Sequence, residues 1–115
     1  MNKTVLCIDD APEVLLLYKR LFESHGYNVV LASNGRDGLE LMRCSSFDCV
    51  ILDYQMPGMD GAAVVRSVSH HAAPPPVILV SGADPPRELK EQVDAFIEKP
   101  TAIFELLERV EAVIG

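Results

Sequence analysis

CVILD, residues 49–53, is an unbroken apolar run that ends in a carboxylate. VLCIDD, residues 5–10, repeats this arrangement with two carboxylates, and VILVS, residues 77–81, repeats it with a hydroxyl. Strands that are buried on both faces lack the alternation of polar and apolar residues seen in half-exposed strands. The three runs therefore predict three central strands of a parallel sheet, each followed by a polar side chain.

Two further apolar runs and five segments with helical spacing complete the pattern. Val29–Leu31 and Ala95–Ile97 predict the second and fifth strands. The residues that mark four helices are Val14, Leu17, Tyr18 and Leu21; Leu39 and Met42; Val64, Val65 and Val68; and Ile103, Leu106, Leu107 and Val110. A short fourth helix is predicted at Arg87–Gln92, after Pro85-Pro86. The resulting (βα)5 order favours an α/β fold with a doubly wound parallel sheet.

Length and composition limit the possible functions. The 115 residues fit one domain, and the net charge of −7 argues against nucleic-acid binding because phosphates select basic surfaces. No apolar stretch reaches the length of a signal-peptide core or a membrane span. Cys7 and Cys49 lie within apolar runs, as expected in a reducing compartment. We therefore expect a soluble, cytoplasmic protein without membrane contact.

Polar side chains converge at one edge of the predicted sheet. Asp9 and Asp10 follow the first strand, Asp53 the third, Ser81 the fourth and Lys99 the fifth. This edge, at the carboxyl ends of the strands, is where open α/β sheets bind ligands. Three crowded carboxylates repel one another, and a bound cation would relieve this repulsion. Mg²⁺ is favoured over Ca²⁺, because Ca²⁺ prefers about six to eight oxygen ligands and no loop of this sequence supplies them. Asp53 can then act as a nucleophile toward phosphorus, with Lys99 and Ser81 stabilising the transferring group.

Each motif also has a purely structural interpretation. Asp10–Glu13 has the spacing of a helix capping box. Pro57-Gly58 predicts a turn and Asp60 a helix N-cap, while Ser81-Gly82 is ordinary loop sequence. Lys99 can be interpreted as an ordinary solvated lysine before a helix. The peptide bond between Lys99 and Pro100 makes this position less ordinary, because an X-Pro bond can be cis in a tight turn.

Together these motifs make the whole chain resemble the receiver domain of bacterial two-component response regulators. The resemblance implies a flavodoxin-like sheet with strand order 2-1-3-4-5. It also implies a single receiver domain over residues 1–115 without an output domain, and a phosphoacceptor signalling protein rather than an enzyme. The residues that carry it are Asp9-Asp10, Asp53, Met56-Pro57-Gly58, Asp60-Gly61, Ser81 and Lys99-Pro100.

The resemblance implies a role for each site residue. Asp53 accepts a phosphoryl group from a sensor histidine kinase or a histidine phosphotransfer domain. Mg²⁺ is held by Asp10, Asp53 and the backbone carbonyl of Gln55, with Asp9 acting through water. Ser81 then moves toward the phosphoryl group.

A conformational change of the fourth helix, fifth strand and last helix is implied to signal to a downstream protein target. Phe96 turns inward in this change. A phenylalanine lacks the hydroxyl of the tyrosine often found at this position, so its movement can act through packing alone. The segment between Ser81 and Lys99 departs from the family pattern, since it is shorter than usual and lacks the common Gly-Ala before the fifth strand.

Three alternative functions fit parts of the sequence. A flavin-binding flavodoxin shares the fold but needs a Ser/Thr/Gly-rich phosphate loop in place of Asp9-Asp10. A haloacid-dehalogenase-like phosphatase carries an aspartate two residues after its nucleophile, where this chain has Gln55. A pseudo-receiver, a non-phosphorylated interaction module, would have lost Asp53 or the acidic pair. The run Leu15–Leu17 exceeds one buried stripe and is either core or a surface for the kinase.

Overall fold

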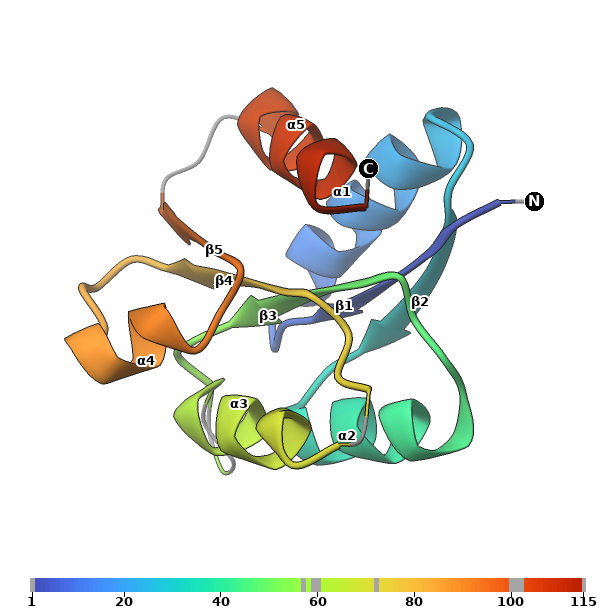
Figure 1. The fold of residues 1–115 in the computed structure, drawn as a ribbon. Helices are drawn as coiled ribbons and strands as arrows, with labels where there is room; N and C mark the ends of the chain where they lie inside the picture. The colour runs from blue at the N-terminus through green and yellow to red at the C-terminus, as the bar shows by residue number, and fades with distance from the viewer. Residues whose placement is uncertain (1, 57, 59–60, 72, 100–102, 115) are drawn as a thin grey trace.

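The computed structural model describes residues 2–56, 58, 61–71, 73–99 and 103–114. These residues form a five-stranded parallel sheet in the order β2-β1-β3-β4-β5, flanked by helices (Figure 1). The elements are, in chain order, β1 (Thr4–Ile8), α1 (Pro12–Ser24), β2 (Asn28–Ala32), α2 (Gly35–Cys44), β3 (Cys49–Asp53), α3 (Gly61–Ser69), β4 (Val77–Ser81), α4 (Arg87–Glu91), β5 (Ala95–Glu98) and α5 (Ile103–Ile114). The predicted doubly wound sheet and its strand order are confirmed.

Helices cover both faces of the sheet. α1 and α5 lie on one face, and α2 and α3 lie on the other, with α4 near the β5 edge (Figure 1). Val5 and Cys7 of β1 pack in the core cluster of α1 and α5, whereas Leu6 and Ile8 pack with α2, α3 and α4. Successive strand residues point to opposite faces, so a strand covered on both sides is apolar throughout.

α1 differs from its predicted apolar stripe. Its buried residues are Leu15, Tyr18 and Phe22, whereas Leu17, which the helical spacing places in the core, is 52% exposed. Phe22 is fully buried, and its ring meets the rings of Tyr18 and Tyr27 edge-on. These aromatic contacts set the rotation of the helix, and the prediction for Leu17 is wrong.

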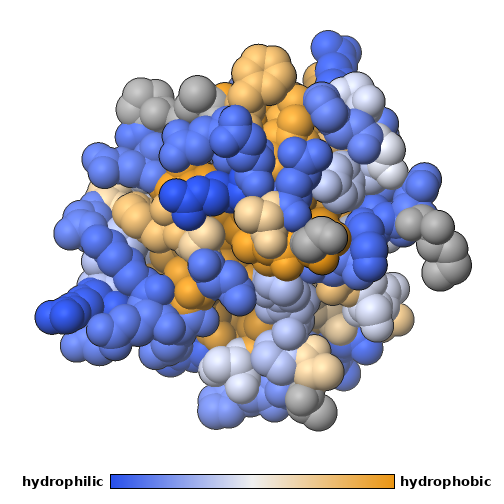
Figure 2. All heavy atoms as spheres, turned by 45° about the horizontal axis from the view of Figure 1, so that its top comes forward, coloured by the Kyte–Doolittle hydropathy of each residue, from blue (hydrophilic) through white to orange (hydrophobic). Residues whose placement is uncertain are grey.

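The face of α1 and α5 exposes large apolar side chains. Leu16, Leu17 and Phe104 remain between 47% and 64% exposed. Figure 2 shows apolar surface gathered among charged residues on this side of the molecule. The run Leu15–Leu17 is therefore core at Leu15 only.

α4 is short, as Pro85-Pro86 predicts. It spans five residues, begins directly after Pro86 and is held to the core by the buried Leu89. The other four predicted helices also form. Within the described part of the chain, the helices are too short or too polar to cross a membrane.

Two carboxylates fasten the amino ends of the strands. The backbone N–H of Thr4 donates to Oδ2 of Asp48 at 2.8 Å, and the N–H of Asp48 donates back to the Thr4 carbonyl at 2.9 Å. Val77 and Asp94 form the same reciprocal pair, with both distances 2.9 Å. Each aspartate directly precedes one strand and bonds the first residue of its neighbour. The amino-terminal edge of the sheet is therefore tied by hydrogen bonds.

Candidate functional site

The backbone brings the predicted polar residues to one edge of the sheet. Asp53 and Ser81 are the last residues of β3 and β4, while Asp9 and Lys99 directly follow β1 and β5. The N–H of Lys99 donates to the Ser81 carbonyl at 2.7 Å, so the hydrogen bonding between β4 and β5 continues past the end of β5. The polar groups of four strands thus lie at the carboxyl-terminal edge.

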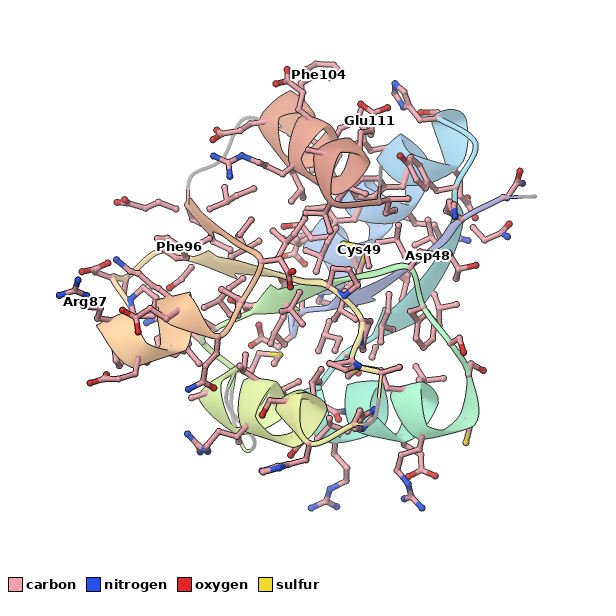
Figure 3. All side chains as sticks on the ribbon, viewed as in Figure 1. Asp48, Cys49, Arg87, Phe96, Phe104 and Glu111 are labelled. Carbon is pink, nitrogen blue, oxygen red and sulfur yellow. The ribbon has the colours of Figure 1, made fainter. Side chains whose placement is uncertain are left out.

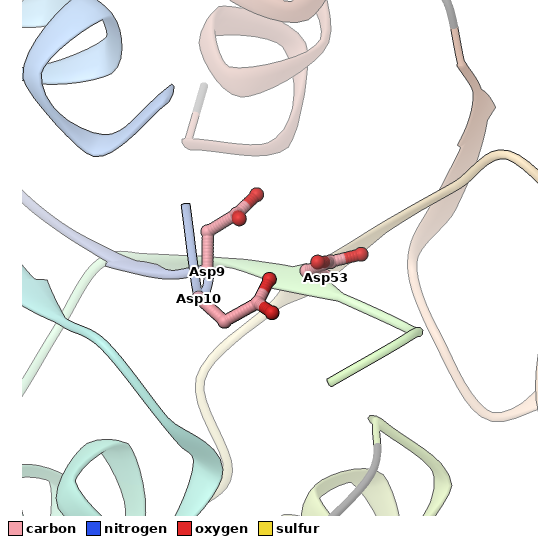
Figure 4. Close-up of side chains that lie close together, drawn as sticks. All are labelled: Asp9, Asp10 and Asp53. Atoms are coloured by element: carbon pink, nitrogen blue, oxygen red, sulfur yellow. The ribbon is translucent and has the colours of Figure 1, made fainter. Parts of the chain in front are cut away.

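Asp9, Asp10 and Asp53 form one acidic cluster (Figure 4). One carboxylate oxygen from each residue lies within 4.8 Å of the other two. Asp9 and Asp53 are only 2% and 5% exposed, whereas Asp10 is exposed. The predicted convergence of three carboxylates is therefore present in the folded chain.

Lys99 bridges the two buried carboxylates. Its Nζ lies 3.4 Å from Oδ1 of Asp53 and 3.7 Å from Oδ2 of Asp9. Burial and then the charge of Asp9 raise the pKa of Asp53 above its ordinary value. The ammonium of Lys99 and the N–H of Gln55, which donates to Asp53 at 3.3 Å, offset only part of this increase in pKa. Ionised Asp53 is therefore destabilised in the folded chain.

The donor set fits a small divalent cation. Three carboxylates and the Lys99 ammonium leave two negative charges in a site where two of the carboxylates are nearly buried. A dication balances these charges, and carboxylate oxygens are ligands that Mg²⁺ prefers. Mg²⁺ also keeps several waters, which the exposed position of Asp10 accommodates.

The interpretation of Asp10 as a helix cap is wrong. The N-cap of α1 is Ala11, and no side chain caps the helix. The Ala11 N–H donates instead to Oδ1 of Asp9 at 2.9 Å. This turn occupies one oxygen of Asp9, while the Asp10 carboxylate lies within the acidic cluster (Figure 4).

Ser81 occupies the site edge and also forms a local turn. The side chain is fully buried; its Oγ donates to the Ala83 carbonyl at 2.7 Å and accepts from the Ala83 N–H at 3.0 Å. Phe96 is half-buried and packs against the core cluster that includes Leu89 of α4. The Nζ of Lys90 lies 5.1 Å from the centre of the Phe96 ring.

Gln55 and Gly61 lie around Asp53. A Cβ added at Gly82 would lie 4.0 Å from Oε1 of Gln55, so this exposed amide reaches the loop after β4. A Cβ at Gly61 would lie only 2.6 Å from the Cα of Tyr54, and the Gly61 N–H donates to the Tyr54 carbonyl at 2.9 Å. Gly61 therefore lets α3 begin against the backbone next to Asp53. Gly61 belongs to a sequence motif, but the motif does not indicate this close packing.

Parts of two predicted turns fall outside the described residues. These are Pro57 and the N-cap residue Asp60 before α3, and Pro100 after Lys99. Gly58 is described, and its φ of +79° is a left-handed conformation suited to glycine. The turn predicted at this glycine agrees with that conformation.

Comparisons with known proteins point to one family. A family model described as "Response regulator receiver domain" matches residues 5–111. Response regulator MprA of Mycolicibacterium vanbaalenii is 32% identical over 118 residues, which cover 99% of this chain and 51% of MprA. Sensor histidine kinase GacS of Pseudomonas protegens is 32% identical over 115 residues, which cover 92% of this chain and 12% of GacS. The chain therefore spans about half of MprA and a small part of GacS.

A solved structure has the same architecture. Response regulator TrrA of Thermotoga maritima, crystallised in complex with Mg(2+)-BeF, matches with a TM-score of 0.88 and 28% identity. The match covers 96% of this chain and 98% of TrrA.

Proposed function

Since the chain belongs to the response regulator receiver family of two-component systems, we propose that Asp53 accepts a phosphoryl group. The observation that carries the proposal is the position of Asp53. It ends a buried strand, lies within 4.8 Å of two other carboxylates and has the Lys99 ammonium 3.4 Å away. This combination offers a carboxylate nucleophile together with a fixed positive charge for phosphoryl oxygens.

The proposed reaction is an in-line displacement at phosphorus. An oxygen of the Asp53 carboxylate attacks the phosphorus of a phosphohistidine, and an O–P bond forms as the P–N bond breaks. The electron pair of the P–N bond returns to the imidazole of the donor. The Lys99 ammonium stabilises the charge on the phosphoryl oxygens. The product on this chain is an aspartyl phosphate.

Mg²⁺ is the proposed cofactor of this reaction. Asp10, Asp53 and the backbone carbonyl of Gln55 would hold it, with Asp9 acting through water. When bound, it screens the repulsion between the carboxylates and the incoming phosphoryl oxygens. Support comes from the two negative charges that Lys99 leaves unbalanced and from the Mg(2+)-BeF complex of TrrA.

A change at Ser81 is proposed to report phosphorylation. The Ser81 hydroxyl leaves the Ala83 carbonyl and donates to a phosphoryl oxygen, which opens the turn that leads toward α4. Phe96 then turns inward by packing alone. The altered face of α4, β5 and α5 is the proposed binding surface for a downstream protein target.

The proposed phosphoryl donor is a sensor histidine kinase or a histidine phosphotransfer domain. Family membership supports this class of donor, and the match to the sensor kinase GacS is consistent with it. Leu16 and Leu17 of α1 would give such a partner an exposed apolar contact.

Phosphorylation can be tested with acetyl phosphate as a small donor. Intact-mass measurement should detect one added phosphoryl group in the presence of Mg²⁺ and none after chelation. Borohydride reduction of the acyl phosphate should place homoserine at position 53. Asp53→Asn should remove the label, whereas Glu108→Gln, on the exposed side of α5, should retain it. Equal labelling of Asp53→Asn would reject the assignment, and an unlabelled wild-type chain would favour the pseudo-receiver alternative.

A further inference from the structure

The face formed by α2 and α3 differs in charge from the rest of the molecule. Of the ten basic and seventeen acidic residues, three arginines and two carboxylates lie on α2 and α3. Seven basic and fifteen acidic residues remain elsewhere, and residues 61–83 contain no carboxylate. In Figure 3, nitrogen-tipped side chains extend from α2 and α3 away from the sheet. A locally basic face thus lies on an acidic protein.

A groove follows this face. A cleft of about 320 Å³ is lined by four residues of α2, one residue of α3 and the residue two positions after α3: Arg36, Leu39, Glu40, Arg43, Ser67 and His71. Leu39 is half-buried, while Arg36 and Arg43 are exposed. His71 also lines a neighbouring cavity of about 100 Å³ that includes Phe47. The groove therefore combines an apolar residue with arginines and extends beyond a single cleft.

The arginines of this face are available to a partner. Arg43 pairs with Glu40 at 2.9 Å, but both side chains are more than 60% exposed, so water screens the pair. In the described part of the chain, no carboxylate lies within ion-pair distance of Arg36 or Arg66. The remaining carboxylate, Asp37, is hydrogen-bonded to Asn34 at the start of α2.

We propose that this groove, the α2–α3 groove, docks an acidic segment of a partner protein. An apolar side chain of the segment covers Leu39, and its carboxylates bind Arg36 and Arg43 of the groove. A further carboxylate binds Arg66, which precedes the lining residue Ser67 on α3. Charge complementarity favours this occupant, because its acidic groups lie opposite the arginines of a locally basic face. A nucleic acid fits less well, since its backbone leaves Leu39 uncovered and meets long-range repulsion from the acidic remainder. The groove contains none of the proposed phosphorylation residues, so the two proposals stand or fall separately.

The proposal can be tested by selecting peptides from a display library of random 12-residue sequences. The library is panned on the wild-type chain after depletion on the double variant Arg36→Glu/Arg66→Glu. The enriched peptides should carry several Asp or Glu residues around an apolar residue. In a nitrogen-15 correlation spectrum, one such peptide should shift the backbone amides of residues 35–43 and 66–71.

Matched variants locate the binding energy. By fluorescence anisotropy, Arg36→Glu/Arg66→Glu should weaken binding of the selected peptide by about tenfold, as expected for reversal of two exposed charges. Leu39→Ser should also weaken it, whereas Arg109→Glu, at an exposed position of α5, should change it less than twofold. A peptide with Gln in place of each acidic residue should lose binding. Circular dichroism checks that each variant is folded, and Arg36→Gln/Arg66→Gln should reproduce the loss in direction.

Several results would overturn the proposal. Enrichment of peptides without acidic residues, or equal weakening by Arg109→Glu, would remove the role of the α2–α3 groove. Equally tight binding of a single-stranded 12-nucleotide DNA would show a general polyanion surface instead. Self-association in analytical ultracentrifugation that disappears in Arg36→Glu/Arg66→Glu would assign the groove to a second copy of the chain.

Discussion

The Lys90 ammonium lies 5.1 Å from the centre of the Phe96 ring and forms an ion pair with Asp84. One side chain of α4 therefore contacts both β5 and the loop that follows Ser81. A cation over an aromatic ring contributes about 0.5–1 kcal/mol at exposed sites. Since α4 has five residues and one buried side chain, Leu89, this contact is a substantial part of what holds the helix.

We expect Lys90→Ala to loosen α4. Hydrogen exchange measured by mass spectrometry should find α4 the least protected helix in the wild type, because it is short and buries little area. Lys90→Ala should increase its exchange several-fold. Arg87→Ala is the control, because Arg87 is 91% exposed and contacts only the neighbouring turn through Glu91. Equal effects of the two substitutions would show that the Phe96 contact contributes nothing.

Magnesium should stabilise the folded chain. A ligand that binds only the folded state adds about 2.7 kcal/mol at a hundredfold excess over its dissociation constant. Asp10→Ala should lose most of this increase, because its exposed carboxylate belongs to the acidic cluster. Thermal unfolding with and without Mg²⁺ measures both effects. An unchanged response in Asp10→Ala would place the cation elsewhere.

In the absence of Mg²⁺, Asp53→Asn should raise the free energy of unfolding at pH 7. The pKa of Asp53 is raised in the folded chain, so the cost to stability builds up as the pH rises above the ordinary pKa of 3.8 and is complete above the pKa of the folded state. The advantage of the amide should shrink as the pH falls and Asp53 takes up a proton. Urea unfolding at several pH values tests this, with Glu108→Gln as the exposed control. Lower stability of Asp53→Asn at pH 7 would mean that the ion pair with Lys99 outweighs burial.

Gln55 should control the lifetime of the aspartyl phosphate. If the proposed aspartyl phosphate forms, the resemblance to receivers implies that two side chains flank the path of the attacking water. They lie two positions after Asp53 and Ser81 and are Gln55 and Ala83. The Gln55 amide can orient a water, with an effect below about 10²-fold, while Ala83 has no polar side-chain atom. Gln55→Ala and Ala83→Glu should each change the rate of phosphate loss, and Ala83→Glu should leave Mg²⁺ binding unaltered. If neither shifts the half-life beyond twofold, water access is set by other residues.

Alkaline pH should destabilise the chain through its buried thiols. Burial, followed by the charges of Asp94 and Asp48, raises the pKa of Cys49 to about 12 from 9.0. Below pH 9 the Cys49 thiol is neutral in both the folded and the unfolded chain, and the folded chain keeps its full stability. Between pH 9 and 12 the unfolded chain releases the proton first, so the free energy of unfolding falls by about 1.4 kcal/mol per pH unit. Cys49→Ala should show a smaller loss of unfolding free energy between pH 8 and pH 10. Cys44→Ala should match the wild type, since Cys44 is exposed.

The sheet and the polar residues at its carboxyl-terminal edge could be predicted, because the same sequence pattern occurs three times. Three strands buried on both faces produce three apolar runs, and parallel topology brings their carboxyl ends together. The exposure of Leu17 could not be predicted, because the rotation of α1 depends on the ring contacts of Phe22 with Tyr18 and Tyr27.

The hydrogen bond that distinguishes two adjacent aspartates could not be predicted from the sequence pattern. Asp9 and Asp10 are chemically equivalent, and only the folded turn determines that Asp9 accepts the Ala11 N–H. The hydrogen bonds of Asp48 and Asp94 could not be predicted either, because a single polar residue before a strand forms no periodic pattern in the sequence. Their partners, Thr4 and Val77, are 44 and 17 residues away in sequence.

The reciprocal pairs of Asp48 with Thr4 and of Asp94 with Val77 hold the sheet at one edge only, the edge opposite the acidic cluster. The amino-terminal edge is held by two backbone–backbone hydrogen bonds and by two bonds from backbone N–H groups to the Asp48 and Asp94 carboxylates, away from the acidic cluster. The opposite edge carries the like charges of the acidic cluster, and the proposed binding of Mg²⁺ and of a phosphoryl group would change that charge. We therefore expect displacement to be largest in the loops at the carboxyl-terminal edge, while the amino-terminal edge keeps its hydrogen bonds.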